Sequence, residues 1–330
     1  MPHSVSTAYS GRRAAVRPSS TISSSALGQL KNRPLYELPL RLGVGWTLSP
    51  PARILAAMSS HTLPIPGPVR WQSGLVGDYT GRQSYREVGT PPVRMVFCWC
   101  PPTPPGQPCL LGSPPDEPER MDRETQRAVD FSDGFWIAQH PVNQQQWQAV
   151  MGKNPSQRGK GELHPVDTVS WDDAKEFCRK TGLRLPSEAE WEYACRAGTT
   201  TPFGIGSGQC LNAQLANFDG NYPYGSGREA FKWLYRQRTL PQGSFPPNSW
   251  GLHDLHGQLW EWCEDVLEGR GRVLRGGGWA DFGRFARSAV RDGLDPANRD
   301  DSIGFRPCPS STSGQASNEA GGRVLPAERG

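Results

Sequence analysis

Residues 272–279, which read Arg-Val-Leu-Arg-Gly-Gly-Gly-Trp, set the pattern for the second half of the chain. A short β-prone run over Arg272–Leu274 is followed by three glycines and a tryptophan. Two similar runs flank it, at Trp260–Cys263 and Ile303–Phe305, and the stretch from 199 to 247 is rich in Gly, Asn, Pro and Tyr. This pattern predicts small antiparallel strands joined by long irregular connections.

Three segments of the first half carry the signature of a helix N-terminus, where a side-chain oxygen accepts from early amides and a residue three places on reaches back. The capping pairs are Asn143 with Gln146, Ser170 with Asp173, and Ser187 with Glu190. We expect a helix after each pair, ending near Gly152, Gly182 and Gly198. Together with the strands, these helices predict an α+β fold that is rich in loops.

The composition excludes several classes of protein. Of the 330 residues, 38 are Gly and 32 are Pro, which excludes collagen, coiled coils and helical repeats. No stretch has 18 consecutive apolar residues or the apolar core of a signal peptide, so we expect no membrane span, no membrane partner and no secretion. We therefore expect a cytoplasmic protein, with its eight cysteines reduced.

The ends of the chain differ from its middle. Residues 1–55 carry seven Lys and Arg residues against Glu37 alone, although the whole chain has a net charge of only +4. Residues 1–90 show no sustained hydrophobic periodicity, which is typical of a segment that cannot bury a core. We expect a disordered basic low-complexity extension over 1–91, a folded domain over 92–308 and a disordered tail over 309–330. A basic extension can touch nucleic acid through phosphates, but a solvated extension is commoner, and we expect no specific nucleic-acid partner.

Seven motifs occur in an order that resembles the formylglycine-generating enzyme (sulfatase-modifying factor) family. They are Gly134–Ile137, Pro165–Trp171, Arg184–Ala194, Asn248–Leu255, Trp260–Trp262, Arg275–Trp279 and Gly304–Arg306. The resemblance covers about residues 92–308. It implies an elaborated C-type lectin fold, in which we expect Trp191, Trp260, Trp262 and Trp279 to fill the core.

The resemblance also bears on catalysis. Enzymes of this family oxidise a substrate cysteine with a copper-binding cysteine pair just after the motif at 275–279, and soft thiolates are the natural ligands for Cu(I). Asp281 and Ala286 fall where this pair would lie. The related sulfoxide-forming branch uses iron-binding histidines, and the six histidines here lack that branch's spacing. We therefore expect no catalytic residue and no enzyme activity.

A third branch fits better. Residues from about 273 to 306 resemble the variable region of diversity-generating retroelement proteins, in which asparagine codons AAC become NNC codons. Such codons cannot encode Trp, Met, Gln, Lys or Glu, and residues 280–303 contain none of these. Ten residues of this segment are ones that NNC codons derived from asparagine codons would readily encode. They are Ala280, Asp281, Phe282, Phe285, Val290, Asp292, Leu294, Asp300, Asp301 and Ser302.

This resemblance predicts a noncatalytic binding protein that displays a diversified C-terminal surface to an unknown protein or other ligand. The alternative is a noncatalytic or enzymatic sulfatase-modifying-factor family protein without diversification. We expect the arginines of the segment, such as Arg287 and Arg291, to hold the loop through carboxylates such as Glu261, Asp265 and Asp295.

The resemblance implies one metal and one crosslink. Ala216-Asn217-Phe218 keeps part of the family's calcium-binding pattern, whereas Gln258 replaces an asparagine of that pattern. We expect no cofactor except Ca²⁺, in at most one site near Asn217. A disulfide between Cys178 and Cys308 would follow the pattern of secreted relatives, but the expected location favours free thiols.

Overall fold

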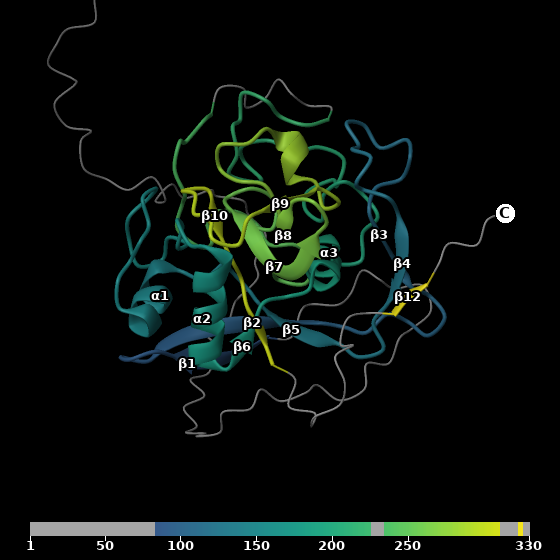
Figure 1. Cartoon of the computed structure of the whole chain (residues 1–330). Coiled ribbons are helices and arrows are strands. Elements are labelled where there is room, and N and C mark those ends of the chain that lie inside the picture. Colours follow the sequence, from purple (N-terminus) through teal and green to yellow (C-terminus); the bar gives the residue numbers. More distant parts are fainter. Residues whose placement is uncertain (1–82, 226–233, 311–322, 326–330) are drawn as a thin grey trace, which may run out of the picture. The chain divides into compact units, whose positions relative to one another are not determined.

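The computed structural model describes residues 83–225, 234–310 and 323–325 (Figure 1), all within the compact unit Ser59–Gly330. Its helices and strands are short. In chain order they are β1 (Gln83–Val88), β2 (Val93–Cys100), β3 (Cys109–Leu111), β4 (Arg127–Asp130), β5 (Phe135–Ala138), α1 (Gln144–Met151), α2 (Trp171–Thr181), β6 (Leu183–Arg184), α3 (Glu188–Arg196), β7 (Trp260–Leu267), β8 (Gly271–Arg275), the 3₁₀ helix η1 (Gly283–Ala286), β9 (Arg291–Leu294), β10 (Ile303–Gly304), β11 (Cys308–Pro309) and β12 (Arg323–Leu325). This confirms the predicted α+β class.

The strands form four small sheets. Their orders are β1-β2-β5, β10-β7-β8-β9, β11-β6 and β12-β4-β3. Among the strands that the structure describes, every pairing is antiparallel except that of β10 with β7. The expectation of antiparallel strands is therefore wrong for β10, because the long segment after β8 returns along β7 in the same direction.

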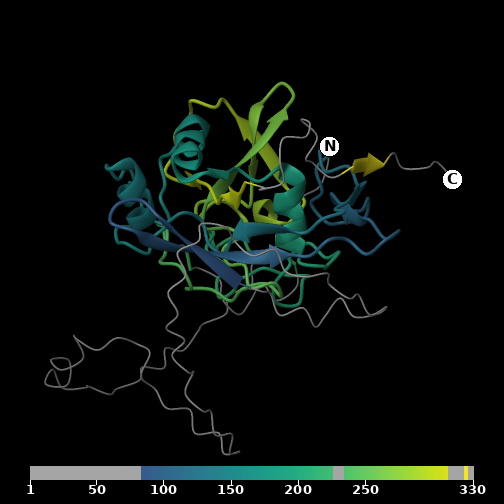
Figure 2. The ribbon, with the colours of Figure 1, turned by 90° about the horizontal axis from the view of Figure 1, so that it is seen from below.

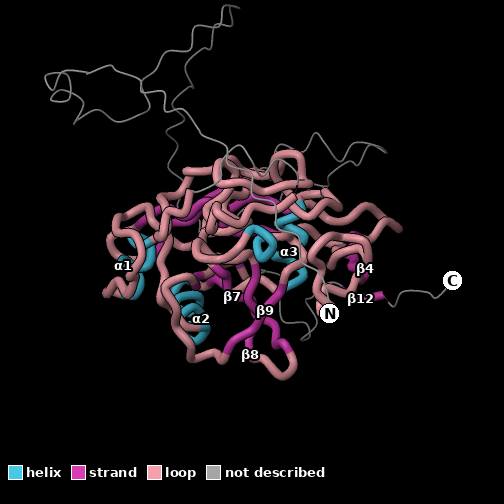
Figure 3. Tube along the Cα trace, turned by 90° about the horizontal axis from the view of Figure 1, so that it is seen from above, coloured by secondary structure: helices cyan, strands magenta, loops and turns pink. Residues whose placement is uncertain are grey.

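The three predicted helices are confirmed, each with its capping box. The side chains of Asn143, Ser170 and Ser187 each accept from the third helical amide, and the residue there bonds back to the cap. Helices α2 and α3 lie on either side of the β7–β8 hairpin (Figures 1 and 3), which in turn projects away from β1 and β2 (Figure 2). The hairpin is thus held from two sides.

Large aromatic side chains fill the interior. Trp191 and Trp262 are fully buried, and Trp260 and Trp279 are buried as well, which confirms that these four belong to the core. Trp147, Phe177 and Phe305 pack together as stacked and edge-on rings. Because each such ring buries a large apolar area, a few of them stabilise a domain with little regular structure.

The predicted boundaries of the domain need correction. β1 lies within the stretch 1–91 that we expected to be disordered, and it pairs with β2 from Gln83↔Cys98 to Val88↔Val93. At the other end, β11 reaches into the expected tail 309–330 and pairs with β6. β12 lies wholly inside this tail and pairs with β4. These edge strands have weak hydrophobic patterns and are stabilised by pairing with partners far away in sequence. The rest of both predicted segments, 1–82 and most of 311–330, lies outside the described residues.

Among the described residues, no helix has the length and apolarity needed to span a bilayer.

Candidate binding surface

The segment between β8 and β10 is anchored at both ends on one strand. Glu261 of β7 pairs with Arg275, the last residue of β8, on one side and with Gly304 of β10 on the other. The 27 residues between the end of β8 and the start of β10, residues 276–302, form a loop that includes β9 and lies within the predicted variable region of about 273–306. Strand pairing therefore fixes where this loop starts and stops.

Two fully buried arginines reinforce these ends. Arg306 donates to both oxygens of Glu261, at 2.6 and 2.7 Å, and Trp191 Nε1 donates to the same carboxylate at 2.7 Å. Arg275 donates to Glu192 of α3 and to the carbonyl of Val290. Burial by itself would raise the pKa of Glu192, but Arg275 and Arg196 beside it bring the pKa below its usual value. These buried charged residues hold the two ends of the loop in place.

A third buried arginine holds the middle of the loop. The Arg287 guanidinium donates to Glu124 at 2.7 and 2.9 Å, to Glu117 at 2.6 Å and to the carbonyl of Glu119 at 2.9 Å. Burial raises the pKa of Glu117 although Arg287 acts in the opposite direction. All three partner residues of Arg287, namely Glu117, Glu119 and Glu124, lie in one segment, 117–124.

The predicted carboxylate partners of these arginines are wrong. Arg291 pairs with Glu188 at 2.6 Å. Arg299 makes a bidentate contact with Asp173 at 2.8 and 3.0 Å. Glu261 instead binds Arg306, and Asp265 accepts from the backbone of Glu188. The true partners come from segments far from the loop in sequence, so spacing within the chain could not identify them.

The ten predicted variable positions are not equally accessible. Ala280, Phe282, Leu294 and Asp300 are exposed, whereas Asp281, Phe285, Asp292, Asp301 and Ser302 are half-buried. Val290 is fully buried in the core cluster that includes Leu274 and Phe305. The assignment of Val290 to a binding face is therefore wrong, because its side chain points into the apolar interior just before β9.

Seven of these positions lie in two segments that come close together. The segments 280–285 and 300–302 meet around two tryptophans, since Trp260 Nε1 donates to Asp281 Oδ2 at 2.7 Å and Trp279 Nε1 donates to the carbonyl of Asp301 at 3.0 Å. Asp292 and Leu294 belong instead to β9, where Asp292 pairs with Arg270 at 2.6 Å. The surface predicted from sequence thus consists of two separate groups.

An aromatic patch dominates the first group. We define it as Tyr222, Phe282, Phe285 and Arg284. The rings of Tyr222 and Phe282 are stacked with centroids 4.0 Å apart, and the Arg284 guanidinium lies 4.6 Å from the ring centre of Phe285. Tyr222 is 52% exposed and Phe282 is 36% exposed. No sequence pattern points to Tyr222, which lies 60 positions before Phe282.

Asp281 and Ala286, where the resemblance places the family's catalytic cysteines, offer no thiol. Asp281 Oδ2 accepts from Gly278 N at 2.8 Å as well as from Trp260, and burial raises its pKa despite these bonds. Ala286 is buried. All eight cysteines are free, including Cys178 and Cys308.

One of the free thiols lies beside a histidine. Cys195 Sγ is 3.5 Å from His256 Nε2, and both residues are buried. Burial raises the pKa of Cys195 to about 12 and lowers the pKa of His256 to about 4. At neutral pH both groups are therefore uncharged, so this pair is not a reactive thiolate.

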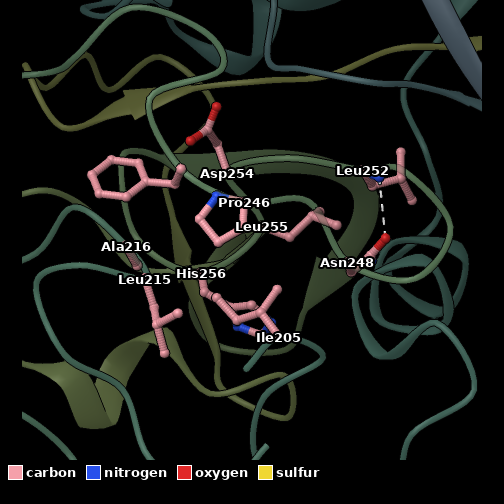
Figure 4. A pocket seen from close by; sticks show the side chains of 10 residues that line it. Ile205, Leu215, Ala216, Pro246, Asn248, Leu252, Asp254, Leu255 and His256 are labelled. Carbon is pink, nitrogen blue, oxygen red and sulfur yellow. Dashed lines mark hydrogen bonds between the residues drawn. The ribbon is translucent and has the colours of Figure 1, made fainter. Parts of the chain in front are cut away.

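His256 serves as a neutral crosslink between loops. Its Nδ1 donates to the carbonyl of Ala286 at 2.7 Å, and its Nε2 accepts from the amide of Gly204 at 3.0 Å. It lines a small pocket with Asp254, Leu252 and other residues (Figure 4). The cavity measures about 10 Å³, which is room for one water molecule and no larger ligand.

The calcium site predicted near Asn217 has one suitable oxygen. Asn217 is buried, and its Nδ2 donates to Gln258 Oε1 at 2.7 Å and to the carbonyl of Arg238 at 2.9 Å. Its Oδ1 is buried without a hydrogen-bond partner, which suits a hard cation such as Ca²⁺. However, the described residues contain no cluster of three or more His, Cys, Asp or Glu side chains that could hold a metal ion. Calcium here would depend on Asn217 and neutral carbonyl oxygens, and it stays a prediction.

Comparisons with known proteins agree with this architecture. Residues 104–309 match the family model of the sulfatase-modifying factor enzyme 1-like domain. Inactive C-alpha-formylglycine-generating enzyme 2 of Mus musculus is 36% identical over 181 residues, which cover 52% of this chain and 56% of that protein. Formylglycine-generating enzyme of the same organism is 33% identical over 196 residues, which cover 52% of this chain and 50% of that protein. The chain thus spans about half the length of these relatives.

Two solved structures show the same fold. Treponema denticola variable protein 1 aligns with a TM-score of 0.55 and 24% identity over 69% of this chain and 99% of that one. PvdO from Pseudomonas aeruginosa aligns with a TM-score of 0.53 and 26% identity over 68% of this chain and 97% of that one. The fold is the C-type lectin fold expected from the motifs. Since the family model matches more than half of the chain, the protein belongs to the sulfatase-modifying factor (formylglycine-generating enzyme) family.

Proposed function

We propose that this protein is a noncatalytic binding protein whose loop 276–302 displays a diversified surface to a protein or other ligand. The observation that carries the proposal is that the residues that hold this loop in place are different from the residues that it exposes. Arg275, Arg287 and Arg306 are fully buried and paired with carboxylates, whereas Ala280, Phe282 and Asp300 are exposed. A surface can change its side chains freely only if the groups that fix its backbone lie elsewhere.

The sequence of the loop supports the same role. Residues 280–303 lack the five amino acids that NNC codons cannot encode. The aromatic patch adds the large planar side chains and arginine that typically anchor protein interfaces. The likeness to Treponema denticola variable protein 1 concerns the fold and is consistent with such a surface.

The noncatalytic part of the proposal rests on Asp281 and Ala286. Neither side chain can replace a thiolate that binds copper. One of the most similar relatives carries the word inactive in its name. We also propose a cytoplasmic location, which agrees with eight free cysteines, and a partner that is neither a membrane nor a specific nucleic acid.

Comparison of DNA sequences tests this function. We expect the neighbouring DNA to contain a near-copy of the codons for 280–302 with AAC at the variable positions, beside a reverse transcriptase gene. Independent isolates should differ at codons such as those of Ala280 and Phe282 and agree at Arg275 and Arg287. Differences spread evenly over the domain, with no such copy, would refute diversification.

A further inference from the structure

We infer that the binding face extends beyond the diversified segment and includes Tyr222, a fixed aromatic anchor that stacks planar side chains of a polypeptide partner. This inference rests on the proposed function. Tyr222 lies in a separate loop, well outside residues 273–306. With about half of its surface accessible, it is one of the most exposed aromatic side chains that the structure describes.

Backbone contacts hold Tyr222 beside position 282 whatever side chain occupies that position. The amide of Gly283 donates to the carbonyl of Tyr222 at 2.9 Å, and the amide of Asp219 donates to the carbonyl of Asp281 at 2.8 Å. A side chain at Gly283 would come within 3.0 Å of the backbone nitrogen of Tyr224. The two loops are therefore joined by main-chain bonds and close packing, neither of which involves the side chain of residue 282.

This arrangement makes Tyr222 a constant part of a changing surface. Phe282 now covers one face of the Tyr222 ring, with a centroid distance of 4.0 Å and an interplanar angle of 29°. A smaller residue at 282 would uncover this face. Position 282 thus determines whether a partner meets a two-ring platform or a single tyrosine ring.

The chemistry of the patch indicates what it binds. The Arg284 guanidinium lies over Phe285 at 4.6 Å and near Phe282 at 5.8 Å, so the rings already accept a planar cation within the protein. Aromatic rings and guanidinium groups stack on such faces. We therefore expect partner segments that present Arg, Trp, Tyr or Phe.

The test uses a random peptide library displayed on phage, selected against the full-length protein. We expect the recovered peptides to be enriched in these four residues. The dissociation constant of one recovered peptide is then measured by isothermal titration calorimetry for the wild type and for Tyr222→Ala, Tyr222→Phe, Phe282→Asn and Tyr85→Ala. Tyr85 is a matched control, because it is 53% exposed and also carries an arginine over its ring. It lies on β1, at the other end of the unit from η1 in Figure 1.

Tyr222→Ala and Phe282→Asn should weaken binding at least tenfold, while Tyr222→Phe, which keeps the ring, and Tyr85→Ala should stay within twofold. If only Phe282→Asn weakens binding, the anchor role of Tyr222 is wrong and the proposed function stands. If neither variant weakens binding, the proposed binding face itself fails. If no peptide is enriched, the assignment of a polypeptide partner is wrong and the proposed function stands. Thermal melts establish that each variant is folded, and Tyr222→Leu replaces Tyr222→Ala if the latter is not.

Discussion

Replacing Arg287 by alanine should destabilise the domain severely although the residue lies within a loop. The guanidinium is fully buried and bonds to the carboxylates of Glu117 and Glu124. Its removal leaves two buried carboxylates without their cation, and breaking a buried pair in this way typically costs about 3–5 kcal/mol. For a domain of this size, such a loss lowers the melting temperature by roughly 6–20 °C.

Arg284→Ala is the matched control, because it removes the same side chain three residues earlier. Arg284 is 45% exposed, and its nearest carboxylate oxygen, on Glu119, is 3.8 Å away. An exposed pair of this kind contributes at most about 1 kcal/mol, so Arg284→Ala should melt within a few degrees of the wild type. Differential scanning calorimetry measures both variants.

A double-mutant cycle tests the reasoning more directly. Glu117→Gln removes one of the carboxylates that Arg287→Ala would leave unpaired. The two changes together should therefore cost less free energy of unfolding than the sum of the single changes. If Arg287→Ala melts like Arg284→Ala, or if the two changes are simply additive, the buried pair does not hold the loop.

The remaining predictions concern catalysis, metal and pH. Purified protein incubated with copper and a Cys-x-Pro-x-Arg peptide should form no aldehyde detectable by mass spectrometry, because Asp281 and Ala286 provide no thiolate pair; copper-dependent turnover would contradict this. Millimolar Ca²⁺ added to chelator-stripped protein should raise the melting temperature if Asn217 Oδ1 binds the ion, and should not do so in Asn217→Ala; an unchanged wild type would refute the site. His256 is uncharged in the fold, with a pKa lowered by burial to about 4 from an ordinary 6.5. The unfolded chain therefore takes up a proton first, and stability should be complete above about pH 6.5 and decline towards pH 4, by up to about 1.4 kcal/mol per pH unit. Urea titrations at several pH values should show a shallower decline in His256→Gln, and equal slopes would contradict this role.

The helices could be predicted because their determinants are local. A cap such as Asn143 and its partner Gln146 are three residues apart, and both bonds form in the structure. Strands with strong β-prone runs, such as β7, could be predicted from the sequence as well. β1 was not predicted because its sequence is mostly polar and Val88 is its one buried residue. Its pairing with β2 and the packing of Val88 in the core stabilise it.

The site was less predictable because its contacts join remote segments. Arg287 and Glu117 are 170 positions apart, and nothing in the local sequence connects Tyr222 with Phe282. Val290 shows a different reason. The codon argument selects residues that a template could yield, but it carries no information about burial, and Val290 fits both the codon pattern and the core.

Because β8 and β10 hold the ends of loop 276–302 on the two sides of Glu261, we expect that this loop can be exchanged as a unit. β8 and β10 are the two neighbours of β7, so the two ends of the loop are about two strand spacings, or roughly 10 Å, apart. Loops of quite different length can close such a short gap, since closure entropy changes only slowly with length. Whole segments could therefore be swapped between relatives, provided that each brings a strand that pairs with β8 and an arginine that reaches the 117–124 segment.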